Sequence, residues 1–158
     1  MKAATVSQLK KELSYRSPEE LLEICLRLSK FKKENKELLT YLLFESADEG
    51  GYIESVKNEI DLEFDAINTS SYYFIKKSVR KILRNIKKYS RYSQKKETEV
   101  ELLIHFCSKL KAFKPSITRN TTLMNLYERQ LALVEKIIST LHEDLQYDYK
   151  LELEDLVI

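Results

Sequence analysis

A helical spacing of apolar residues between Ser71 and Ser93 restricts the fold of this chain more than any other feature of its sequence. At about 100° per residue, these residues fall on one stripe roughly 120° wide. Because such a stripe must be buried, we expect an amphipathic helix that packs against other helices. The stripe consists of Tyr72, Ile75, Val79, Ile82, Leu83, Ile86 and Tyr89.

Basic residues occupy an adjoining arc of the same helix, about 140° wide. No acidic residue occurs between Asp65 and Glu97, and three tyrosines (Tyr73, Tyr89 and Tyr92) lie near the basic side chains. This arc is a candidate surface for phosphate groups or for an acidic partner. It consists of Lys76, Lys77, Arg80, Lys81, Arg84, Lys87, Lys88 and Arg91.

The same helical periodicity recurs along the chain, and 158 residues include only two Gly and two Pro. Thr5 with Gln8 predicts a short first helix, and Ser17-Pro18 with Glu20 predicts the start of the next one. We therefore expect an all-α fold: a single domain of six or seven helices over residues 1–146. The helices are expected to pack as hairpins, in a bundle or a solenoid-like stack.

Residues 147–158 form an acidic C-terminal tail, and polar and apolar residues alternate strictly over residues 147–154. We expect this tail to be a helix end that packs on the domain or frays from it. The alternative is an extended segment that joins the sheet edge of a partner.

A heptad-like seam follows Asn120 in the last long helix, which we expect to continue to about Leu145. This seam is a candidate self-association surface, and it would serve equally well in the core of a bundle. Its residues are Tyr127, Leu131, Val134, Ile138 and Leu141.

The charges of the chain are segregated, although the formal net charge is only +2. Residues 45–65 contain eight acidic residues and one Lys, whereas residues 76–96 contain ten basic residues and no acidic one. The interpretation that we favour is that the acidic helix lies beside the basic helix and neutralises it within the fold. The other interpretation is that the basic arc is open and binds a partner.

No residue pattern indicates a catalytic, metal or cofactor site. Cys25 and Cys107 lie among leucines and are expected in the core. Glu97, Glu101 and His105 share one helix face, but a metal site normally needs more ligands and supporting contacts. The chain has no glycine-rich phosphate loop and no ExxH pair.

Residues 9–45 contain a leucine, lysine and glutamate pattern that includes SPEEL and KENKE. This segment resembles the start of a family of small all-helical bacterial proteins of unknown function. The resemblance implies a bacterial, all-helical protein and assigns no site residue.

The sequence has no signal-peptide pattern and no apolar run of membrane-spanning length, so we expect a cytoplasmic location without a membrane span. The favoured function is a non-enzymatic protein-interaction or regulatory module with a protein partner, or one that self-associates. The alternative is nucleic-acid binding through the basic helix 71–96, and a third hypothesis is a metal-dependent all-α hydrolase.

Overall fold

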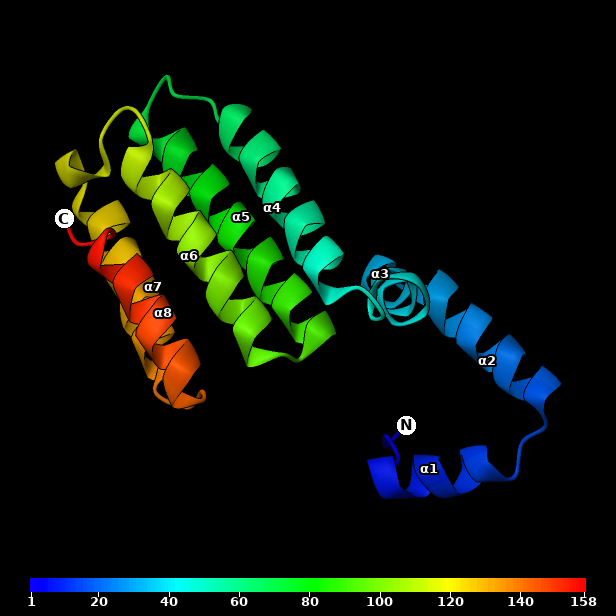
Figure 1. Cartoon of the computed structure of the whole chain (residues 1–158). Helices are drawn as coiled ribbons and strands as arrows, with labels where there is room; N and C mark the ends of the chain where they lie inside the picture. The colour runs from blue at the N-terminus through cyan, green and yellow to red at the C-terminus, as the bar shows by residue number, and fades with distance from the viewer. The chain divides into compact units, whose positions relative to one another are not determined.

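The computed structural model describes residues 1–158 and consists of eight α-helices, two short helical turns and no strand (Figure 1). The all-α class is confirmed, with one helix more than the upper number expected. The chain divides into two compact units, Met1–Phe44 and Glu45–Ile158, which we call the N-terminal and C-terminal units.

The N-terminal unit contains α1 (Val6–Ser14), α2 (Pro18–Phe31) and α3 (Lys33–Thr40), and it ends within the π-helical turn η1 (Tyr41–Glu45). Both expected capping boxes are present, one before α1 and one before α2. The helices α2 and α3 pack against each other and join at Lys32.

The C-terminal unit contains α4 (Glu49–Asp65), α5 (Tyr72–Ser93), α6 (Lys96–Ala112), α7 (Thr121–Ile138) and α8 (Glu143–Glu154). A 3-10 turn, η2 (Ile117–Arg119), lies between α6 and α7. Helix α6 is central, because it packs against α4, α5 and α7, while α8 packs on α7 (Figure 1). The core therefore forms around α6, whose buried side chains include Leu102, Leu103, Phe106 and Leu110.

The apolar stripe of α5 faces this core, as the sequence predicts. Its five aliphatic residues are buried, while the tyrosines at its two ends are half-buried. The Tyr72 hydroxyl donates to the Ser116 carbonyl at 2.9 Å, and the Tyr89 hydroxyl donates to Glu59 at 2.9 Å. The stripe thus fixes which side of α5 points away from the core.

The C-terminal segment is helical and packed, so the extended alternative is wrong. Helix α7 ends at Ile138, and His142 caps the separate helix α8. Residue 146, the expected end of the helical domain, lies within α8. Tyr149 and Leu156 are buried, and the Tyr127 hydroxyl donates to the Leu156 carbonyl. These contacts hold the end of the chain against α7.

The two cysteines lie in different environments. Cys107 is buried on α6, and this burial raises the pKa of its thiol to about 12. Cys25 is exposed on α2, contrary to the expectation of a core residue, because it lines an open groove between α2 and α3 that α3 does not close.

Candidate functional site

The basic arc of α5 is open to solvent. No acidic side chain forms an ion pair with any of seven of its cations, of which all but the half-buried Lys76 are exposed. We call this surface the basic face. Its seven unpaired cations are Lys76, Lys77, Arg80, Lys81, Arg84, Lys87 and Arg91.

The acidic helix α4 packs beside α5, as the favoured interpretation expects, but its carboxylates form no ion pair with the seven cations of the basic face, which corrects the second part of that interpretation. Carboxylates of α4 accept hydrogen bonds from uncharged groups of α5, such as the 3.0 Å bond from Asn85 Nδ2 to Glu63. The acidic side chains of α4 that form ion pairs turn towards α6, towards Lys57 on α4 itself, or towards Lys95, which directly precedes α6. The reason is geometric, since the stripe of α5 packs inwards on α4 and α6 and leaves the arc on the outer side.

An exposed aromatic side chain lies within the basic face. Tyr73 is 67% exposed, and at 100° per residue it falls in the middle of the arc, in line with Lys77, Arg80 and Arg91. Its ring packs edge-to-face on Phe74, with the ring centroids 5.3 Å apart. Of the three tyrosines that the sequence places near the cations, Tyr73 is the most exposed. Helical periodicity is the sequence signal that distinguishes Tyr73 from Tyr89 and Tyr92, because it places Tyr73 in the middle of the arc.

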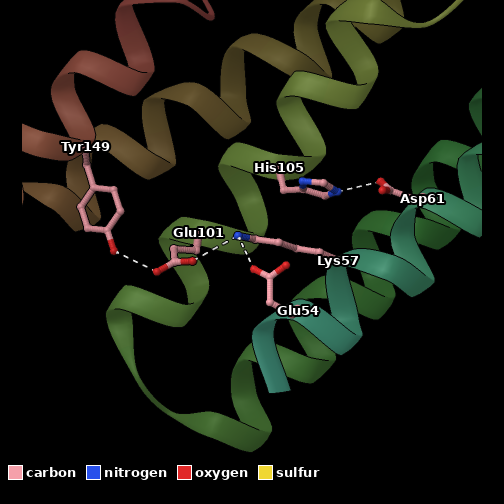
Figure 2. A network of polar contacts seen from close by, with 6 residues as sticks. All are labelled: Glu54, Lys57, Asp61, Glu101, His105 and Tyr149. Atoms are coloured by element: carbon pink, nitrogen blue, oxygen red, sulfur yellow. Dashed lines mark hydrogen bonds and ion pairs between the residues drawn. The ribbon is translucent and has the colours of Figure 1, made fainter. Parts of the chain in front are cut away.

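A second cluster of charged residues joins α4, α6 and α8 (Figure 2). Lys57 Nζ lies 3.2 Å from Glu101 on α6 and 3.2 Å from Glu54 on its own helix. Burial alone would lower the pKa of Lys57, but its contacts with Glu101 and Glu54 outweigh burial and raise it. The Tyr149 hydroxyl donates to Glu101 at 3.4 Å, and burial together with the Glu101 charge raises the pKa of Tyr149 to about 12.

His105 belongs to the same cluster and contacts Asp61 (Figure 2). Its Nε2 lies 2.7 Å from Asp61 Oδ1, and Lys109 Nζ lies 3.4 Å from the same oxygen. Burial would raise the pKa of Asp61, but the hydrogen bond and charge of His105, with the charge of Lys109, lower it overall. The carboxylate is therefore held in its ionised form.

This cluster borders a cleft of about 480 Å³, but its charged groups already have partners. Lys57 and His105 both point to carboxylates, so neither is poised as a free acid or base. Of the three residues considered as metal ligands, Glu101 contacts Lys57 and His105 contacts Asp61. No group of three or more suitable side chains could hold a metal ion. The cluster is best described as a set of ties between helices.

The candidate self-association seam, which lies on α7 apart from Leu141 in the turn after it, is mainly inside the C-terminal unit. Tyr127, Val134 and Ile138 are at most 1% exposed, and Leu131 and Leu141 are half-buried. These residues belong to the core, which is the second role that the heptad pattern allows.

Comparisons with protein-family models, with curated proteins and with solved structures found no match to this chain. None of its helices combines the length and the apolar character that crossing a membrane requires. An account of the function therefore rests on the chain's own surfaces.

Proposed function

We propose that the protein is a non-enzymatic, cytoplasmic binding protein whose basic face binds the phosphate backbone of a nucleic acid. The observation that carries this proposal is the set of seven cations on α5 that have no ion-pair partner within the chain. Like charges held together on one helix repel each other, and an anionic ligand would relieve that repulsion.

The dimensions of the basic face suit a strand of phosphates. Lys77 and Arg91 are 14 residues apart, which corresponds to about 21 Å along a helix. Successive phosphates of one strand advance by about 3.4 Å along a duplex, so this length spans roughly six of them. The buried stripe beneath the basic face keeps α5 rigid, so little ordering of the protein is needed on binding.

The basic face is suited to binding nucleic acids of different base sequence. Arg and Lys in a row neutralise phosphates, and Tyr73 offers one ring on which an unpaired base can stack. Metal-dependent hydrolysis has less support, because Glu101 is paired with Lys57 and no group of three or more suitable side chains could hold a metal ion.

The test compares two triple variants that change the net charge equally. Arg80, Arg84 and Arg91 are reversed to Glu in one, and Arg119, Lys136 and Lys150 in the other; all six side chains are exposed. Affinity for a fluorescent oligonucleotide is measured by anisotropy at physiological salt. We expect the first variant to bind at least 100-fold more weakly and the second to change by only about three-fold.

A thermal melt by circular dichroism accompanies each binding curve, since the first variant must remain folded for its loss to be interpretable. Equal losses in the two variants would mean that only net charge matters, which contradicts a defined site. Failure of the parent protein to bind any oligonucleotide would overturn the proposal.

A further inference from the structure

The aromatic side chains of α5 are open at one end of the basic face and engaged at the other. Tyr73 is 67% exposed and Phe74 is 41% exposed, and both lie in the first turn of the helix. Near the opposite end, Tyr89 and Tyr92 are half-buried, and their ring centroids lie 6.1 Å apart. The Lys88 ammonium also lies 5.1 Å from the centroid of the Tyr89 ring. The start of α5 is therefore where a base finds an open ring.

Tyr73 comes directly before the row of cations on the same side of α5. It precedes Lys76, the first cation of the basic face, by three residues, which corresponds to about 4.5 Å along the helix axis. Side chains on an α-helix lean towards its N-terminus, so the Tyr73 ring extends towards the start of α5 and away from the later cations. The segment before α5, residues 66–71, contains no basic residue. Along this surface, an open ring is thus followed by a row of cations.

Base pairing decides which nucleic acid can use both features. The bases of a duplex are stacked inside it, so a ring beside the backbone reaches the face of a base only where pairing has ended. A strand that is unpaired throughout is normally bound by rings interleaved with the cations, on which successive bases stack. Between Lys76 and Arg91, the one aromatic residue is Tyr89, whose ring is already engaged. The row of cations therefore suits paired nucleotides, and Tyr73 suits an unpaired one.

We infer that the ligand is a duplex that ends in an unpaired extension, with one strand of the duplex along the basic face and the first unpaired base on Tyr73. The inference rests on the proposed function and names the class of nucleic acid that the same surface selects. The offset of about 4.5 Å between Tyr73 and Lys76 is close to one nucleotide step, about 3.4 Å along a duplex. Phe74 packs edge-to-face on Tyr73, with ring centroids 5.3 Å apart, which restricts the orientation of the Tyr73 ring.

Fluorescence anisotropy at physiological salt compares DNA ligands that share one duplex sequence. The ligands are the blunt duplex, the duplex with a 5′ extension, the duplex with a 3′ extension, and one strand alone. We expect one of the extended duplexes to bind about ten-fold more tightly than the blunt duplex, because one base gains a stacking partner. The single strand should bind more weakly than that extended duplex. An extension of abasic nucleotides keeps the added phosphates and removes the bases, so it should lose most of the gain.

Substitution of Tyr73 tests whether the gain comes from this ring. Tyr73→Ala should abolish the preference for the extended duplex and change the affinity for the blunt duplex by less than about two-fold, because no phosphate contact is lost. Tyr147→Ala on α8 is the matched control, since Tyr147 is also 67% exposed, and it should leave the preference intact. The chain contains no Trp, so Tyr73→Trp introduces a single indole. Its fluorescence should be quenched by the extended duplex and not by the blunt one.

The outcomes separate a failure of this inference from a failure of the proposed function. Equal binding of blunt and extended duplexes by the parent protein would overturn the inference and leave the basic face as a nucleic-acid surface. A single strand that binds as tightly as the preferred extended duplex would also overturn it, because pairing along the cations would then contribute nothing. Failure of the parent protein to bind any of these ligands would overturn the proposed function and this inference together.

Discussion

Because of the contact between Asp61 and His105, we expect the C-terminal unit to lose stability as the pH falls. We consider Asp61→Asn, which keeps the size and the oxygen acceptor of the side chain but removes its charge. The carboxylate loses its attraction to His105 at 2.7 Å and to Lys109 at 3.4 Å. Because Asp61 is 39% exposed, solvent screens both contacts, and we expect a loss of about 1 kcal/mol in the free energy of unfolding at pH 6.

The pH dependence follows from the lowered pKa of Asp61. The folded state holds this carboxylate ionised to a lower pH than the unfolded chain, in which the pKa has its ordinary value of 3.8. The stabilisation is therefore complete above about pH 5, declines as the pH falls through 3.8, and is lost below the folded pKa. The difference between parent and variant should shrink over this interval.

Urea unfolding monitored by circular dichroism, at several pH values from 6 down to 2.5, measures this difference directly. Asp65→Asn is the matched control, because Asp65 lies one helical turn further along α4, is exposed and has no ion-pair partner. We expect the control to change stability by less than about 0.5 kcal/mol at every pH. A difference between the parent and Asp61→Asn that stays constant from pH 6 to 2.5 would refute the reasoning.

Three further predictions concern single residues. Val79→Asp buries an unpaired carboxylate where the parent side chain is 0% exposed, so the C-terminal unit should unfold, and an unchanged thermal melt would contradict this. Tyr73→Ala should weaken binding of a single-stranded oligonucleotide by roughly ten-fold and of a duplex much less, as measured by anisotropy; equal effects would exclude stacking. Tyr127→Phe removes the hydrogen bond to the Leu156 carbonyl and should cost about 1 kcal/mol in urea unfolding, while a cost near zero would mean that the bond contributes nothing.

Much of the fold follows from local signals in the sequence. The capping boxes of Thr5 and Ser17 define where α1 and α2 begin, because the side chains that satisfy free backbone N–H groups lie within three residues. The stripe of α5 faces the core because its periodicity leaves no other buried side for the helix.

The parts that the sequence misses depend on which helices become neighbours in space. The opposite charges of α4 and α5 suggest pairing, but the choice between α5 and α6 as ion-pair partner is made by packing, which turned Asp61 towards His105. Cys25 has the leucine neighbours of a core residue, yet it is exposed, because core formation needs a facing element and not only an apolar helix. Periodicity describes one helix and contains no information about what lies opposite it.

The salt dependence of oligonucleotide binding shows whether the basic face binds phosphates. We expect the logarithm of the association constant to fall linearly with the logarithm of salt concentration. If five or six of the seven unpaired cations contact phosphates, the slope for duplex DNA should be about −5, or roughly a 1,000-fold loss between 50 and 200 mM salt. The variant with Arg80, Arg84 and Arg91 reversed should lose about three units of that slope. A slope near zero in the parent, or an equal slope in the two proteins, would contradict the assignment of the basic face as the binding surface.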